Sequence, residues 1–157
     1  MSFEEKLTWV NATTTVIVVA IYAWLIGDQL GTTPVTEIAY QRPMIMAAIA
    51  MIVLTIIGAI VTAIGSAVGT AVRVQVTGEG SMDDIDHIDR SDERDKSIGR
   101  RGDLVGYYVS SVLMFGVLVI TMIEVEYFWI ANAMFAAFVI AGLTSSAVKL
   151  VGYRRGF

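Results

Sequence analysis

Residues 73–103 read RVQVTGEGSMDDIDHIDRSDERDKSIGRRGD, and this charged connector separates two pairs of long apolar segments. It contains six Lys or Arg residues and nine Asp or Glu residues, whereas the interiors of the flanking apolar segments contain no charged residue. An uncharged run of about 20 residues is long enough to cross a hydrocarbon core of about 30 Å as a helix. The sequence therefore predicts an all-α protein, a bundle of four transmembrane helices with one sizeable hydrophilic connector between the second and third helices.

The four crossings are expected at about residues 7–26, 44–72, 104–123 and 127–148, within a single domain of residues 1–157. Residues 1–6 lack the basic start and small-residue cleavage site of a signal peptide, so the first run is expected to be a retained helix. The second run is longer than one crossing needs, which indicates a tilt or an emerging end. Only residues 124–126 separate the third and fourth runs, so these two helices are predicted to be antiparallel neighbours.

The composition excludes several classes of function. The chain has 157 residues, is 55% hydrophobic, has a mean hydropathy of +0.67 and carries a formal net charge of -4, which disfavours nucleic-acid binding. It has no cysteine and a single histidine, His87, so disulfides, thiolate metal sites and bis-histidine haem ligation within one chain are excluded. We find no nucleophile–base pair, metal triad or phosphate loop, and therefore predict a protein that is not an enzyme and needs no cofactor.

The distribution of Lys and Arg predicts the orientation in the membrane. If both termini and the connector share one side, that side holds ten of the eleven basic residues: Lys6, Arg73, Arg90, Arg94, Lys96, Arg100, Arg101, Lys149, Arg154 and Arg155. The other side holds only Arg42. Because cytoplasmic segments carry the excess of Lys and Arg, we expect both termini and the connector in the cytoplasm of a multi-pass plasma-membrane protein.

Small residues recur at a spacing of three or four along three of the helices, which places them on one helix face. Helices in lipid associate through such faces because small side chains allow close approach. This pattern is compatible with packing inside the bundle and with a dimer interface or sliding surface. The predicted helix-packing residues are Gly58, Thr62, Gly65, Ser66, Gly69, Gly102, Gly106, Ser110, Ala137 and Ala141.

The connector contains an acidic part and a predicted helix start. Residues 83–89 gather Asp side chains around His87, a pattern compatible with a divalent cation site or with a solvated acidic loop. Ser91 can cap a helix whose first turn carries Asp92 and Glu93, where the helix dipole favours anions. That helix either leads straight into the third crossing or breaks at Gly99 and Gly102.

A resemblance adds to this interpretation. The sequence DERD at residues 92–95, followed by RGD at 101–103, resembles the motif before the third crossing of a small four-helix membrane protein family of bacteria and archaea that has no assigned activity. The sequences MSFEEK at 1–6, FWIANA at 128–133 and YRRGF at 153–157 are similar to its actinobacterial branch. The acidic residues 83–89 depart from that pattern. The resemblance implies four helices and, by association, a membrane partner for a small helix-turn-helix regulator.

Two functions remain open from the sequence. The first is a docking or regulatory protein that contacts a cytoplasmic or membrane partner through Asp92, Glu93, Arg94, Asp95, Arg100 and Arg101, because mixed charge on a preformed helix favours specific contact. The second is a small oligomeric transporter or pore, with a polar path formed by Asn11, Thr14, Thr62, Ser66 and Ser110. The absence of charge in mid-membrane disfavours proton coupling. The expected partners are the lipid bilayer, another protein and further copies of the chain, and not nucleic acid.

Overall fold

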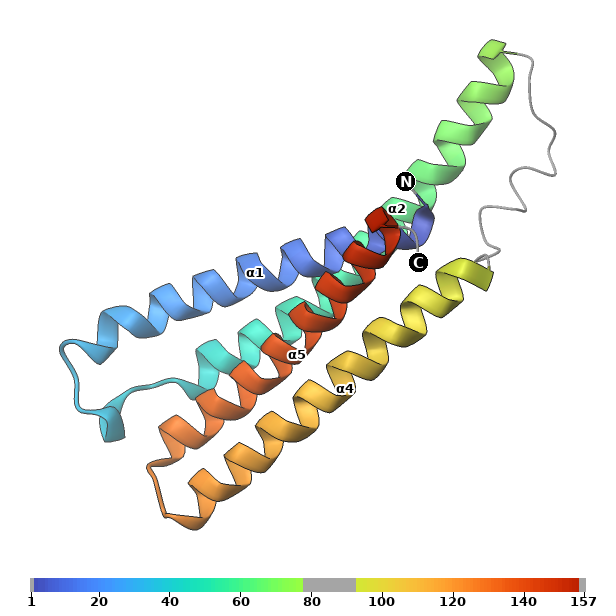
Figure 1. Cartoon of the computed structure of the whole chain (residues 1–157). Coiled ribbons are helices and arrows are strands. Elements are labelled where there is room, and N and C mark those ends of the chain that lie inside the picture. The colour runs from blue at the N-terminus through green and yellow to red at the C-terminus, as the bar shows by residue number, and fades with distance from the viewer. Residues whose placement is uncertain (1, 78–92, 156–157) are drawn as a thin grey trace.

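The computed structural model describes residues 2–77 and 93–155, with side chains described in 2–68 and 93–155. This part contains four long helices, α1 (Phe3–Leu30), α2 (Gln41–Thr77), α4 (Glu93–Met122) and α5 (Tyr127–Arg155), and a short 3-10 helix η1 (Val35–Glu37) (Figure 1). It contains no β-strand. All four long helices are long and apolar enough to cross a membrane, so the predicted all-α class with four candidate crossings is confirmed. The acidic residues 83–89 and Asp92 lie outside the described residues.

Each helix extends past at least one end of its predicted crossing, although α4 ends at Met122, one residue before the predicted end. The largest difference is at α4, which begins at Glu93 rather than near residue 104 and runs without interruption through Gly99 and Gly102. The continuous helix is therefore the correct one of the two alternatives that the sequence left open. Hydropathy marks only the apolar part of a helix, whereas caps and tertiary packing decide where the helix ends. At α1, for example, the Ser2 hydroxyl accepts a hydrogen bond from the backbone N–H of Glu5 at 3.2 Å, which starts the helix before its apolar run.

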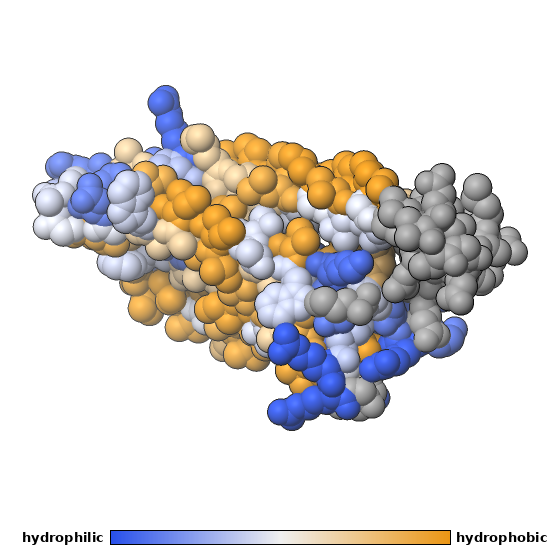
Figure 2. Space-filling view, turned by 90° about the horizontal axis from the view of Figure 1, so that it is seen from above, coloured by the Kyte–Doolittle hydropathy of each residue, from blue (hydrophilic) through white to orange (hydrophobic). Residues whose placement is uncertain are grey.

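The helices pack mainly in the order α2, α1, α5, α4. In the described part of the chain, α2 has α1 as its only substantial neighbour, and α4 has only α5. Most of α2 is consequently exposed along its apolar length. Figure 2 shows an apolar surface over the middle of the molecule and polar surface towards its two ends. An apolar middle of this kind suits hydrocarbon and not water, because large exposed apolar areas are rare on soluble monomers.

A cluster of aromatic and aliphatic side chains packs α1 against α5 and the loop before α2. Tyr22 is 6% exposed, and its ring lies 5.1 Å from that of Phe135. Tyr40 meets Phe128 edge to face at 5.2 Å, which fastens the α1–α2 loop to the start of α5. The buried members of the cluster are Val18, Tyr22, Ile26, Ile38, Ala47 and Phe128.

At the opposite end, α4 and α5 approach closely through glycine. A Cβ at Gly102 would lie 2.9 Å from the backbone oxygen of Ser145, and one at Gly106 would lie 3.0 Å from the Ser145 Cβ. On α5, Gly152 faces Ile98 of α4, which is 2% exposed. The missing side chains let the two backbones approach, which is the role that small residues have between membrane helices. The first turns of α4 are therefore held on the last turns of α5, next to the amino terminus of α1 (Figure 1).

Candidate functional site

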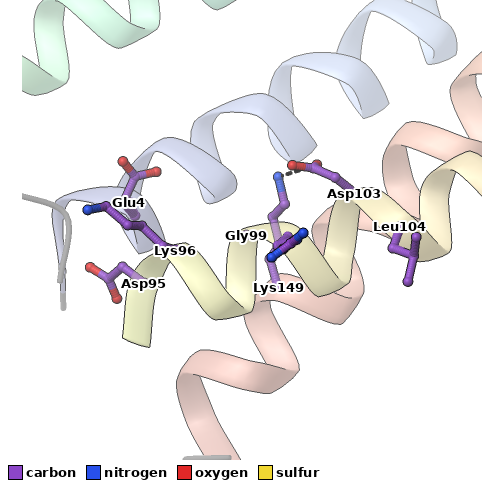
Figure 3. Close-up of a pocket in the computed structure, with 8 residues that line it drawn as sticks. Glu4, Asp95, Lys96, Gly99, Asp103, Leu104 and Lys149 are labelled. Carbon is purple, nitrogen blue, oxygen red and sulfur yellow. Dashed lines mark ion pairs between the residues drawn. The ribbon is translucent and has the colours of Figure 1, made fainter. Parts of the chain in front are cut away.

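A charged cleft lies where the first turns of α1 and α4 meet the last turns of α5. Its volume is about 560 Å³, within the range of small-molecule sites. Figure 3 shows Glu4, Asp95 and Lys96 gathered at one end of the cleft, and the Lys149–Asp103 ion pair further along α4. We call this cavity the end cleft, and its lining residues are Glu4, Asp95, Lys96, Gly99, Arg100, Asp103, Leu104 and Lys149.

Three helices position these side chains. Glu4 stands in the first turn of α1, directly after the Ser2 cap. The position of the α4 residues along α5 is fixed because Ile98 is buried against Gly152 of α5. Lys149 Nζ of α5 lies 2.7 Å from Asp103 Oδ1 of α4, so these two residues form an ion pair.

The charges of the end cleft balance. Three carboxylates (Glu4, Asp95, Asp103) and three cations (Lys96, Arg100, Lys149) line it. Glu4 and Asp95 are half-buried, whereas Lys96 and Arg100 are exposed. These four side chains make no ion pair within 4.0 Å with a residue that the structure describes; they are Glu4, Asp95, Lys96 and Arg100. The cleft therefore offers charges of both signs that are not neutralised by one another.

The end cleft lies at the level where three helices change from charged to apolar. On α1 the apolar run follows Lys6, on α4 it follows Asp103, and on α5 it ends before Lys149. Trp9 lies one turn deeper on α1, and the Arg154 guanidinium carbon lies 5.6 Å from the centre of its ring. Trp and Tyr favour the boundary between headgroups and hydrocarbon, so this level has the character of a membrane surface.

The structure divides the predicted partner-binding residues into two groups. Glu93, Arg94, Arg100 and Arg101 are exposed on α4, whereas Asp95 is half-buried and lines the end cleft together with Arg100. Asp92 lies outside the described residues. One face of this part of α4, marked by Ile98, Gly102 and Gly106, is buried. We call the opposite side, which carries Glu93, Arg94, Ser97, Arg100 and Arg101, the outer face of α4.

Of the predicted helix-packing residues, some lie at contacts between helices and others do not. Gly102, Gly106, Ala137 and Ala141 are buried, and Gly58 faces the Val10 side chain of α1. The position of a Cβ on Gly65 has nothing within 4 Å among the described residues, so this glycine lies on the exposed side of α2. Ser110, Thr62 and Ser66 are half-buried, and the last two donate their hydroxyls to carbonyls of α2 itself. Gly69 lies in the part of α2 whose side chains are not described.

A polar contact that the sequence did not predict joins α1 to α5. The Tyr22 hydroxyl donates to Asn132 Oδ1 at 2.7 Å, and Asn132 Nδ2 donates to the Phe128 carbonyl at 2.8 Å. Buried amides require such partners, because an unpaired polar group in an apolar medium costs several kcal/mol. Asn11 is exposed instead, and its side chain has no hydrogen bond within the described residues. Only the 3.6-residue period could have signalled the pairing, since it places Tyr22 with Val18 and Ile26 on the buried face of α1.

Several residues of the end cleft were likewise missed from the sequence. Lys96 and Lys149 were considered only as charges that orient the chain, and Glu4 and Asp103 only as parts of the sequences MSFEEK and RGD. One signal was available in the sequence. Asp103 directly precedes the third apolar run and Lys149 directly follows the fourth, so antiparallel packing of these two helices places both residues at the same membrane surface. Among the described residues, no three His, Asp or Glu side chains are grouped closely enough to hold a metal ion. Comparison of the chain with known proteins finds no matching family model, no matching curated protein and no matching solved structure.

Proposed function

We propose that this chain is a non-enzymatic multi-pass protein of the plasma membrane that presents the outer face of α4 to a protein partner on the cytoplasmic side. The single observation that carries the proposal is the anchoring of α4 beyond its apolar run. Ile98 and Gly102 are buried against α5, while the residues between and around them turn their charges outward. A surface that is fixed in place before binding loses less conformational entropy when a partner docks.

The charge pattern of the outer face supports a protein partner over a lipid surface alone. Glu93 and Arg94 are adjacent and opposite in sign, and Arg100 and Arg101 follow two turns later. A purely basic patch attracts any anionic surface, whereas a face that carries both signs of charge favours a partner with the complementary order of charges. The excess of Lys and Arg at this end of the chain favours the cytoplasmic side.

The alternative, an oligomeric transporter or pore, has less support. Its path would need polar side chains that face one another across the helices. Asn11 is exposed on α1, the Thr62 hydroxyl donates to the Gly58 carbonyl of its own helix, and Ser110 stands on α4, whose only substantial neighbour is α5. These side chains belong to separate faces in the described part of a single chain.

Site-specific photo-cross-linking tests the docking proposal. A photoreactive residue at Ser97, in the middle of the outer face, should give a discrete adduct with one protein in native membranes. Exchanging two neighbouring charges with Glu93→Lys and Arg94→Glu should abolish that adduct, although the net charge stays constant. A second pair of variants compares Arg101→Glu, which changes the outer face, with Arg155→Glu, which does not. Arg155 is the matched control because both arginines are exposed at the same end of the molecule. An adduct that survives the exchange, or that Arg155→Glu removes equally, would refute docking through the outer face.

A further inference from the structure

We propose that the end cleft binds one zwitterionic phospholipid by its headgroup, with the phosphate on Arg100 and a primary ammonium on Glu4 and Asp95. The ligand class is a phosphoethanolamine lipid. The end cleft shares Arg100 with the outer face of α4, but its other lining residues lie outside that face. Lipid binding to the cleft is measured in the absence of a protein partner.

The charge balance of the cleft selects the ligand class. A simple anion would meet the three carboxylates of the cleft, and a simple cation would meet its three ammonium or guanidinium groups. A ligand that carries both signs a few bonds apart satisfies both sets. Glu4, Asp95, Lys96 and Arg100 are the groups left without an ion pair to a described residue, so a bound headgroup would supply their missing partners.

The chemistry of the individual groups assigns the two ends of the headgroup. The guanidinium of Arg100, which lines the cleft, presents several N–H groups in a fixed plane that matches two phosphate oxygens. The carboxylates of Glu4 and Asp95 come from different helices and lie near one end of the cleft (Figure 3). They accept hydrogen bonds, which a primary ammonium donates and a quaternary ammonium cannot.

The position of the cleft favours a lipid over a soluble zwitterion. Leu104 lines the cleft one helical turn after Arg100, is 53% exposed and begins the apolar run of α4. A molecule whose charged end occupies the cleft would therefore direct an apolar tail along α4 at the level where the helices become hydrophobic. The cleft is also shallow and open and not enclosed, so a ligand held by its headgroup can leave its tail outside the protein.

Gly99 supplies a test that leaves the charges intact. It lines the cleft, and the position of a Cβ there has nothing within 4 Å among the described residues. Gly99→Leu should therefore occupy the cleft without clashing with the protein, while it improves helix propensity at an interior position. Ser97→Leu adds the same side chain on the outer face and is the matched control.

Native mass spectrometry of the full chain in detergent provides the measurement. Phosphatidylethanolamine, phosphatidylcholine and phosphatidylglycerol with identical acyl chains compete at equal concentration. We expect one phosphatidylethanolamine per chain to be retained preferentially. Removing both carboxylates with Glu4→Gln and Asp95→Asn should reduce its preference over phosphatidylcholine about fivefold, the factor that a partly solvated charge pair supports. The control pair Glu5→Gln and Glu93→Gln should leave the preference unchanged, and Gly99→Leu should abolish the retained lipid.

Other outcomes overturn the proposal. Equal retention of the three lipids would indicate ordinary annular contact, and a preference for phosphatidylglycerol would indicate attraction to the basic surface alone. Displacement by an equal concentration of water-soluble glycerophosphoethanolamine would show that the tail contributes nothing, so that the ligand is a soluble headgroup. Retention unchanged by Gly99→Leu, with helicity preserved, would place the lipid elsewhere on the protein.

Discussion

Lys149 Nζ of α5 lies 2.7 Å from Asp103 Oδ1 of α4, and the Ser145 hydroxyl donates to the same carboxylate oxygen at 3.3 Å. Both charged residues border the apolar part of their helices. The contact therefore sets the register of α4 on α5 at the level where each helix changes from charged to apolar. Both residues also line the end cleft.

Removing this ion pair should cost little stability. We expect Asp103→Asn to lower the free energy of unfolding by less than about 1 kcal/mol, because the Asp103 side chain is 68% exposed and water screens the pair. Thermal melting of helicity in detergent would measure it, with Lys149→Met and the double variant completing a mutant cycle. A coupling energy above about 2 kcal/mol would contradict a solvated pair.

The glycine contact between α4 and α5 should be far less tolerant. Gly102→Ala places a methyl group 2.9 Å from the backbone oxygen of Ser145, which cannot move without separating the helices. We expect a loss of about 1–3 kcal/mol, the usual cost of overpacking. Gly116→Ala is the control on the same helix, because nothing described lies within 4 Å of its Cβ position. The two variants melting at the same temperature would show that α4 and α5 do not approach through Gly102.

Two glycines of α2 should respond differently to the same substitution. A Cβ on Gly58 would overlap the side chain of Val10, whereas Gly65 has open space around it. Gly58→Leu should therefore separate α1 from α2, and Gly65→Leu should leave that pair intact. Thermal melting of helicity in detergent would compare the two variants, and Gly58→Leu should melt at the lower temperature. Equal melting of the two variants would argue against the close approach of α1 and α2 at Gly58.

The Tyr22–Asn132 hydrogen bond should contribute a modest amount. Tyr22→Phe retains the ring packed on Phe135 and removes only the hydroxyl that donates to Asn132. Hydrogen bonds between membrane helices contribute about 0.6 kcal/mol on average and up to about 1.7 kcal/mol, and we expect a loss in that range. Tyr127→Phe is the control, since Tyr127 is 81% exposed near the same end. Identical melting of the two variants would show that the bond adds no stability.

The arrangement of the helices was only partly predictable from the sequence. The four apolar runs could be recognised from the sequence, because the thickness of the hydrocarbon core sets the length of an uncharged segment that crosses it. The antiparallel pairing of α4 and α5 follows from the short connection between them, residues 123–126. The order α2, α1, α5, α4 does not follow, because lipid-facing and protein-facing sides of a membrane helix are almost equally apolar.

The candidate site shows the same limit. The charged residues 92–101 were predicted to form one docking surface, but helix geometry distributes them over two flanks of α4. Ile98 determines this division, because its burial against Gly152 rotates Asp95 towards the end cleft and leaves Arg94 and Arg101 on the outer face. A single apolar residue within a charged run indicates a buried side, but its partner on α5 is visible only in three dimensions.

The orientation of the chain yields the most direct test of the proposed function. Among the described side chains, the end that carries the outer face holds eight Lys or Arg residues, and the opposite end holds only Arg42. Because such an excess stays on the cytoplasmic side, a cysteine at Ser97 should be shielded from a membrane-impermeant maleimide in intact cells, whereas one at Thr36 should be labelled. The chain has no native cysteine, so each label reports one position. Permeabilised cells should label both positions. Labelling of Ser97→Cys in intact cells, with Thr36→Cys protected, would place the outer face outside the cell and remove cytoplasmic docking from consideration.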